Sequence, residues 1–306
     1  MYMERPSFDP GLTNKYTGSV RRTINKDGTL NVHRRGTTWR DFHPYLHLIN
    51  MGWPKFFLVL FAGYLLANTI FAVAYFLLGP QALEGIKGTS EAERFMGDFF
   101  FSAHTLSTVG YGNIVPHGTG GSVLSAFEAW VGILSFAVAA GLLYGRVSRP
   151  SARFGFSQQA LIAPYQNGQS LQFRLVNRRT NSLMDVEARV MLMTVESQGG
   201  QSVRKYKLLK LERDQVMFLA LTWTVVHPID ADSPFWGKSS ADLERLQAEL
   251  LILIKAYDDT FSQTVLARAS YRHDELIWGA RFAPAFSVDS RGDLVLELKR
   301  LSETTP

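Results

Sequence analysis

The sequence TVGYG, residues 108–112, combines residue types and spacing that indicate the clearest chemistry in the chain. Glycine adopts positive φ freely and residues with a Cβ resist it, so glycines alternating with Val109 and Tyr111 permit a backbone of alternating handedness. Consecutive carbonyl oxygens can then point the same way. Four such segments around an axis would form stacked rings of oxygens that replace the hydration shell of K⁺. This pentapeptide is itself the known example of a potassium filter, and the interpretation applies that example.

The expected K⁺ ligands are therefore the backbone carbonyls of Thr108, Val109, Gly110 and Tyr111, with the Thr108 hydroxyl as the innermost ring. Gly112 completes the segment. K⁺ ions in the filter are the expected bound ions, and no organic cofactor is expected. The alternative is a Gly-Tyr-Gly turn in an ordinary loop. The segments on either side argue against that alternative.

Two long apolar segments flank the filter sequence. Residues 56–78 contain no charge, and residues 121–145 contain only Glu128. Each segment exceeds the roughly 20 residues that span a hydrocarbon core about 30 Å thick. The first begins too far from the N-terminus, and is too long, to be a signal peptide. Between them, the apolar stretch before the filter is too short to cross a bilayer. It predicts a re-entrant pore helix, which is tolerated at membrane depth where protein or water surrounds it.

Basic residues are concentrated before the first span and after the second. The connection between the spans has only Lys87 and Arg94 against four acidic residues, Glu84, Glu91, Glu93 and Asp98. The positive-inside rule then places both termini in the cytoplasm of, we expect, a bacterial inner membrane. The net charge of +5 fits a basic belt beside anionic lipid and does not require a nucleic acid partner. Cysteine is absent, which excludes disulfides and thiolate metal sites.

The pattern divides the chain into four parts. Residues 1–36 are a polar cytoplasmic segment, and residues 37–52 have the apolar spacing of an amphipathic helix in the membrane interface, although Pro44 interrupts it and a plain loop is the alternative. Residues 53–149 form the pore domain. Its expected elements are a first span at about 54–78, a pore helix at about 92–106, the filter at 108–112 and a second span at about 120–147.

The fourth part, residues 150–306, changes to an alternation of period two. Turns rich in glycine, asparagine, aspartate and proline separate the apolar runs, and only residues 239–249 are clearly helical. Many short strands with one helix predict a cytoplasmic all-β sandwich. The expected strands are 170–177, 185–195, 203–211, 216–226, 249–257, 264–271 and 292–301.

Two motifs in this last part narrow the interpretation. They are WTVVHPIDADSP at residues 223–234 and ARASYRHDELIWGARF at residues 267–282. Together with the two spans around TVGYG, they make most of the chain resemble the inward-rectifier potassium channels, in particular their bacterial branch. TVGYG alone indicates only a potassium channel, and the later motifs select the family. The resemblance implies a non-enzymatic homotetramer, with an immunoglobulin-like cytoplasmic domain that extends an all-α membrane pore.

The second span carries four candidate residues: the resemblance assigns Tyr144 and Phe136, and the sequence itself singles out Glu128 and Gly132. Tyr144 matches the gate where these helices converge, with an interface tyrosine as the alternative. Glu128 either faces the pore or is paired behind the filter. Gly132 permits either bending or close packing. Phe136 stands where strong rectifiers carry an acidic residue, so weak voltage-dependent block by polyamines or Mg²⁺ is expected.

Further assignments lie outside that span or at its C-terminal end. His104 replaces a glutamate that supports the filter in many members, and it is either a pH-sensitive support or a neutral packed histidine. Asp258 and Asp259 fall in the family's cytoplasmic constriction loop, with a solvated turn as the alternative. Four arginines match positions that bind anionic lipid, including phosphoinositides, in relatives, with simple membrane anchoring as the alternative: Arg40, Arg146, Arg149 and Arg153.

Three other functions have less support in the sequence. A two-span potassium channel with a nucleotide- or calcium-binding domain would be expected to show a G-x-G-x-x-G turn, and the sequence after residue 150 has none. A membrane-tethered enzyme lacks support, because no metal cluster, nucleophile elbow or phosphate loop is present. A potassium transporter subunit would be expected to carry several degenerate filter segments, whereas this chain has a single intact one.

Overall fold

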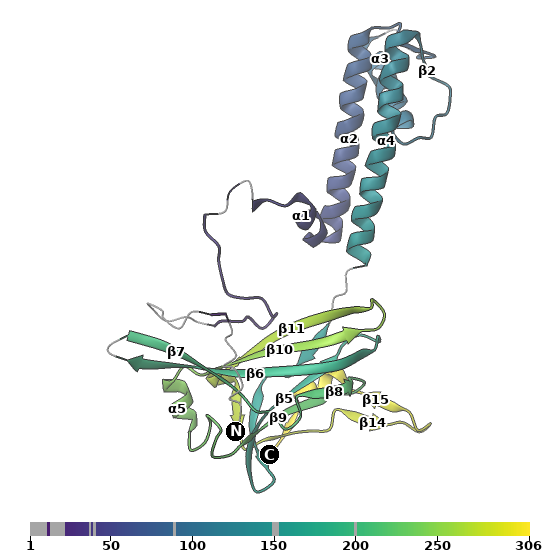
Figure 1. The fold of residues 1–306 in the computed structure, drawn as a ribbon. Helices are drawn as coiled ribbons and strands as arrows, with labels where there is room; N and C mark the ends of the chain where they lie inside the picture. Colours follow the sequence, from purple (N-terminus) through teal and green to yellow (C-terminus); the bar gives the residue numbers. More distant parts are fainter. Residues whose placement is uncertain are drawn as a thin grey trace, which may run out of the picture. The chain divides into compact units, whose positions relative to one another are not determined.

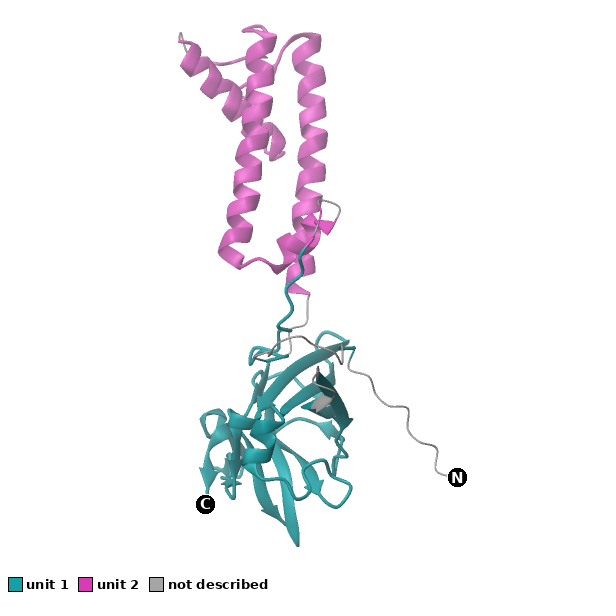
Figure 2. Cartoon of the chain, turned by 90° about the vertical axis from the view of Figure 1, so that its left-hand side faces the viewer, with its two compact units in different colours: residues 1–35, 150–306 teal, residues 36–149 magenta. Residues whose placement is uncertain are grey.

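A computed structural model describes residues 11–12, 22–36, 38, 41–87, 90–148, 153–198 and 201–306 of the chain. The chain forms two compact units. One is Gly36–Arg149, and the other combines Met1–Arg35 with Pro150–Pro306 (Figures 1 and 2). The described part of the N-terminal segment therefore belongs to the strand-rich unit, although the sequence suggested a separate part.

The first unit is helical. Its elements are α1 (Pro44–Asn50), α2 (Trp53–Leu78), α3 (Glu91–Leu106) and α4 (Gly118–Val147). At 26 and 30 residues, α2 and α4 are long and apolar enough to cross a membrane. The short α3 packs on both, through a cluster of buried apolar side chains (Figure 1). The cluster consists of Phe71, Tyr75, Leu83, Phe101 and Leu106.

The interfacial helix is shorter than the range 37–52 predicted for it. It begins at Pro44, which occupies the first turn, where a missing N–H costs nothing and the fixed φ favours the helix. Pro44 therefore starts α1 and does not interrupt it. Thr37, Trp39 and Arg40 lie outside the described residues.

The pore helix α3 begins with a capping box. The Ser90 side chain accepts a hydrogen bond from the Glu93 N–H, and the Glu93 carboxylate accepts one from the Ser90 N–H. Glu91 and Glu93 also place negative charge beside the positive end of the helix dipole. These contacts determine where α3 starts, and its last turn leads directly into residues 108–112.

The second unit is a sandwich of two five-stranded sheets, as the sequence predicted. Buried apolar side chains from both sheets form its core. The first sheet has the order β11 (Gln263–Arg272), β10 (Glu249–Asp258), β6 (Leu183–Gln198), β7 (Gln201–Leu208), with β8 (Gln215–Phe218) on β6. The second has the order β12 (Leu276–Trp278), β4 (Ala160–Tyr165), β5 (Gly168–Asn177), β3 (Phe154–Phe156), with β9 (Trp223–Ile229) on β5.

Smaller elements complete the two units. In the strand-rich unit, α5 (Ser240–Arg245) corresponds to the predicted helix, and η2 (His273–Glu275) follows β11. Three two-stranded sheets pair β1 (Leu83–Glu84) with β2 (Val115–Pro116), β13 (Arg281–Phe282) with β16 (Thr304–Thr305), and β14 (Phe286–Val288) with β15 (Leu294–Leu296).

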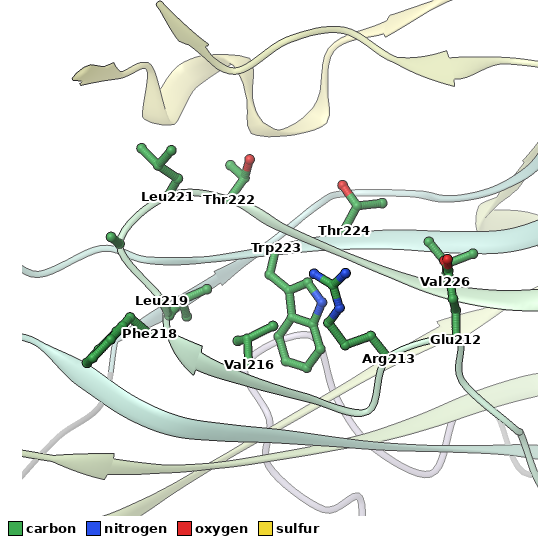
Figure 3. Close-up of a pocket in the computed structure, with 11 residues that line it drawn as sticks. Glu212, Arg213, Val216, Phe218, Leu219, Leu221, Thr222, Trp223, Thr224 and Val226 are labelled. Atoms are coloured by element: carbon green, nitrogen blue, oxygen red, sulfur yellow. The ribbon is translucent and has the colours of Figure 1, made fainter. Parts of the chain in front are cut away.

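Two predicted strands were wrong in extent. Residues 216–226 are not one strand, because the chain crosses from β8 in one sheet to β9 in the other, and Leu219 is buried at the crossing. The crossing residues line a pocket of about 440 Å³ together with Trp223 and Arg213 (Figure 3). Residues 292–301 contain only the short β15 and then turn into a 3₁₀ helix, η3 (Leu298–Ser302). Alternating apolar residues do not reveal a change of partner sheet, because both sheets bury the same core.

The second motif fastens the N-terminal segment to the sandwich. Arg22 forms an ion pair with Glu275 at 2.7 Å and donates a hydrogen bond to the Ser270 hydroxyl at 2.8 Å. The backbone N–H of Thr23 donates to the buried carboxylate of Glu249 at 3.0 Å. Ile24 is buried beside β6 and β10. Residues 22–24 are thus held by charge-assisted hydrogen bonds, which are about twice as strong as neutral ones.

The first motif places a histidine in the interior of the sandwich. His227 is 4% exposed on β9. Its Nδ1 lies 2.6 Å from the Lys210 carbonyl, and its Nε2 lies 2.8 Å from the Ser233 hydroxyl. Because a carbonyl only accepts, Nδ1 carries the proton, and in the neutral ring Nε2 accepts from the Ser233 hydroxyl. Burial lowers the pKa of His227 below its usual value of 6.5.

This histidine predicts acid sensitivity of the cytoplasmic unit. The unfolded chain gains a proton at His227 below about pH 6.5 while the folded chain does not, so the free energy of unfolding falls as the pH falls through that value. We expect the thermal midpoint of the purified full chain to drop between pH 7.5 and 5.5, and His227→Gln to make that drop smaller. His33→Gln, at an exposed site, is the control. An equal pH dependence in His227→Gln would contradict the assignment.

Candidate ion-conduction site

The backbone of residues 108–112 alternates in handedness, as the sequence predicted. Thr108, Gly110 and Gly112 have φ of 60°, 56° and 77°, whereas Val109 and Tyr111 do not have positive φ. Glycine adopts this conformation without strain. Thr108 has a branched Cβ, and such a residue costs on the order of 1–3 kcal/mol there. The surrounding contacts must therefore hold the segment in place.

The last turn of α3 supplies those contacts. The His104 carbonyl accepts hydrogen bonds from the N–H groups of Val109 at 2.9 Å and Gly110 at 3.1 Å, and the Thr105 carbonyl accepts from Thr108 at 3.0 Å. Helix-end carbonyls need such partners. The filter backbone thus satisfies the end of the pore helix, and the negative end of the helix dipole lies beside Thr108, where it favours a cation.

His104 also contacts the filter through its side chain. Its ring meets the Tyr111 ring edge to face, with the ring centroids 4.7 Å apart and the planes at 89°. Such pairs contribute about 0.5–1.5 kcal/mol beyond their buried area. One residue of α3 therefore touches both the beginning and the outer end of the filter, which is the geometry that a filter support needs.

A small sheet holds the chain where it leaves the filter. β1 and β2 pair Glu84 with Val115, and the His117 N–H donates to the Ala82 carbonyl at 2.8 Å. Gly85 has φ of 101°, and a Cβ there would lie 2.3 Å from the Asn113 carbonyl oxygen. Only glycine allows this approach. The sequence analysis missed this element, because two-residue strands leave no periodic signal.

Glu128 is enclosed between α2, α3 and α4. Its side chain is fully buried and accepts hydrogen bonds from the Tyr75 hydroxyl at 2.8 Å and the Ser102 hydroxyl at 2.5 Å. The assignment of Glu128 to the pore was wrong, and the alternative of a paired carboxylate behind the filter is the one that the structure contains.

Gly132 is a packing residue for a similar reason. A Cβ at this position would lie 2.2 Å from the Leu106 carbonyl oxygen, so the glycine lets α4 approach the end of the pore helix. Placing it among pore-lining residues was also wrong. Four-residue steps along a helix advance the side chain by about 40° each, so the face that includes Glu128 has turned by about 160° at Tyr144.

The two remaining candidates lie further around α4, with Phe136 about 80° and Tyr144 about 160° from Glu128. Phe136 and Tyr144 are 78% and 74% exposed in the single chain. Large apolar side chains exposed in this way indicate a surface that contacts other molecules. Both side chains are therefore free to contact other molecules, whereas Glu128 and Gly132 are buried within the chain.

The Arg146 side chain binds backbone carbonyls of the same chain, so its assignment to lipid was wrong. Its guanidinium donates to the carbonyls of Leu48, Ile49 and Met51 at 2.5, 2.9 and 2.7 Å. It also lies 4.4 Å from the centre of the Phe56 ring. A cation at helix-end carbonyls stabilises that end, so Arg146 fastens α1 to the end of α4.

The other residues proposed for lipid binding or for the cytoplasmic constriction differ in their exposure and contacts. Arg40 and Arg149 lie outside the described residues, and Arg153 is exposed. Asp258 is fully buried, where it accepts from the Asn181 amide at 2.9 Å and the Thr260 N–H at 3.1 Å. It stabilises the β10–β11 turn and was wrongly placed at a constriction, whereas Asp259 is exposed.

Residues 154–306 match the inward rectifier potassium channel C-terminal domain, and residues 58–148 match the ion channel family. The chain is 35% identical to inward rectifier potassium channel Kirbac3.1 of Paramagnetospirillum magnetotacticum, over 92% of this chain and 95% of that protein. It is 27% identical to G protein-activated inward rectifier potassium channel 3 of Mus musculus, over 94% of this chain and 79% of that protein.

Because Glu128 is buried and accepts two hydrogen bonds, its removal should destabilise the helical unit. Glu128→Ala leaves the Tyr75 and Ser102 hydroxyls without their acceptor, so we expect a loss of stability of about 3 kcal/mol. Tyr75→Phe removes one hydrogen bond and should cost about 1 kcal/mol. Glu128→Gln should lower the thermal midpoint while leaving single-channel conductance and internal Mg²⁺ block unchanged. A change of conductance or block at unchanged stability would return Glu128 to the pore.

Proposed function

The chain belongs to the inward rectifier potassium channel family, and we propose that it conducts K⁺ as a homotetramer whose four copies of residues 108–112 surround one axis. The observation that carries this proposal is the positive φ at Thr108, Gly110 and Gly112, which alternates with the absence of positive φ at Val109 and Tyr111. One chain supplies a quarter of each oxygen ring. Four chains supply rings that replace water around K⁺, with the carbonyls of Thr108, Val109, Gly110 and Tyr111 as ligands.

We propose that the gate lies on the exposed face of α4. Four Tyr144 side chains near one axis would form a constriction that dewets when narrow. Because Arg146 fastens α1 to this end of α4, a displacement of α1 in the interface would act directly on the gate. Anionic lipid is the proposed modulator of α1, with both termini on the cytoplasmic side of a bacterial inner membrane.

The remaining candidates have more limited proposed roles. His104 supports the filter through Tyr111 and through its own carbonyl. Arg153 is the described arginine proposed to contact lipid headgroups, with Arg40 and Arg149 outside the described residues. Asp259 is proposed to face the cytoplasmic ion pathway at the β10–β11 turn. Rectification is proposed to be weak, because Phe136 brings no negative charge to the cavity.

The filter assignment is tested by replacing a glycine of positive φ with a residue that resists positive φ. Gly110→Ala places a Cβ at φ of 56°, so we expect loss of K⁺ selectivity in liposome flux of K⁺ against Na⁺. Gly120→Ala is the matched control, because its Cβ would meet only Leu78 at 3.6 Å. Equal flux of both ions through the unmodified chain, or normal selectivity in Gly110→Ala, would contradict the proposal.

Rectification is tested at Phe136. In planar bilayers, internal spermine should block the unmodified channel weakly. Phe136→Asp should strengthen that block at least tenfold, because four carboxylates would attract the polyamine in a narrow cavity. Phe136→Asn, of similar size to aspartate but neutral, should not strengthen it. Strong block of the unmodified channel would overturn the assignment of weak rectification.

A further inference from the structure

Two polar side chains of α2 contact the pore helix α3, which packs closely against α2 (Figure 1). Tyr64 and Asn68 lie four residues apart and therefore share one face of α2. Asn68 is fully buried. A buried amide is costly unless its polar atoms are bonded, and asparagine in membrane helices commonly forms hydrogen bonds to neighbouring helices. The bonds of this amide therefore show what it contributes to the helical unit.

The Asn68 amide has one defined orientation. Its Nδ2 donates to the Tyr64 carbonyl at 2.7 Å, and because a carbonyl only accepts, the amide oxygen must point away from it. That oxygen accepts from the Ser102 hydroxyl on α3 at 3.1 Å, and Ser102 is also fully buried. The backbone of α2 thus fixes an acceptor that faces the pore helix.

Tyr64 makes a second contact one residue further along α3. Its hydroxyl donates to the Ala103 carbonyl at 3.2 Å. The same carbonyl accepts from the N–H of Ser107 at 3.2 Å, where the helix ends and the chain turns toward the filter. Tyr64 therefore holds α3 at the turn that leads into residues 108–112.

Four consecutive residues of α3 connect α2 to the filter. Ser102 and Ala103 bind α2, whereas the carbonyls of His104 and Thr105 accept the hydrogen bonds from the N–H groups of residues 108–110. Hydrogen bonds weaken steeply when their distance or angle departs from the preferred values. A rotation or shift of this last turn would therefore loosen the bonds that hold the filter backbone.

Directed contacts are needed because apolar packing does not fix the rotation of a helix. Leu106 packs in the apolar cluster of the helical unit, and such contacts are non-directional. Glu128 on α4 provides one directed contact, to Ser102. Tyr64 and Asn68 provide two more from α2. Together these three contacts define both the position and the rotation of the end of α3.

We propose that Tyr64 and Asn68 are positioning residues for K⁺ selectivity, acting through the last turn of α3. This role rests on the proposed conduction through residues 108–112. K⁺ exchanges its water for carbonyl oxygens that are already in place, so a filter whose supporting turn is loosened should discriminate less between K⁺ and Na⁺. Tyr64 and Asn68 act at a distance from the ion, because their contacts are to α3 and to α2 itself.

The test is the permeability ratio of K⁺ to Na⁺, measured from reversal potentials of the full chain in planar bilayers. Asn68→Leu keeps the approximate size and removes both polar atoms, and Tyr64→Phe removes only the hydroxyl. We expect each to lower the ratio by about threefold or more, and Y64F/N68L by about tenfold or more. Thr69→Val is the matched control, because the exposed Thr69 hydroxyl donates within α2, to the Leu65 carbonyl at 2.8 Å. Its ratio should change by less than about twofold.

A double-mutant cycle tests the path through Ser102. Ser102→Ala removes the donor to Asn68, so Asn68→Leu should change the permeability ratio by less than about twofold in that background. An undiminished effect of Asn68→Leu in the Ser102→Ala background would overturn the proposal. A merely structural role would lower the thermal midpoint of unfolding and leave the permeability ratio of the folded channel unchanged, which would overturn it as well.

The remaining outcomes separate this proposal from the proposed conduction. A selective unmodified channel whose selectivity is retained in Y64F/N68L, or lost equally in Thr69→Val, would overturn the role of Tyr64 and Asn68 alone. Equal permeability of K⁺ and Na⁺ in the unmodified channel would overturn the conduction proposal, and this role with it. If Asn68→Leu does not assemble, Tyr64→Phe decides, because it removes a single hydroxyl from a side chain that is 36% exposed.

Discussion

The His104 carbonyl, with hydrogen bonds from Val109 and Gly110, is the contact on which the rest of the helical unit depends. A K⁺ ion exchanges its water for carbonyl oxygens only where those oxygens already point toward it. Within the described part of the chain, the filter backbone has no partner strand. Its conformation, including positive φ at Thr108, is therefore maintained by the end of the pore helix. Any residue that positions α3 consequently acts on the filter.

Several features of the helical unit can be understood as support for α3. The capping box at Ser90 determines where the helix begins, and Glu128 accepts hydrogen bonds from Ser102 on α3 and Tyr75 on α2. Gly132 allows α4 to contact the carbonyl at the end of α3. A buried carboxylate is costly unless its hydrogen bonds are made, and here two hydroxyl groups make them. The polar cluster thus gives one defined orientation to a helix that also packs through apolar contacts.

Several charged residues in both units bind other parts of the chain, although their charge suggested binding of ligands. Arg146 binds three carbonyls at the end of α1, and Asp258 binds the turn that follows β10. Glu249 and Glu275 hold the N-terminal segment on the sandwich. Charges whose partners are already in the chain stabilise the fold.

The sequence by itself determined the two spans, the pore helix, the filter and its alternating backbone, and the all-β character of residues 150–306. These depend on composition over long windows and on the conformational freedom of glycine, which are local properties. Only the tertiary structure decided that Glu128 and Gly132 face α3. It also decided that Arg146 and Asp258 form hydrogen bonds within the chain, and that residues 216–226 belong to two sheets. A side chain's role depends on which residues from distant segments fill the space around it, and helical spacing gives relative directions along one element without showing which direction faces the neighbour.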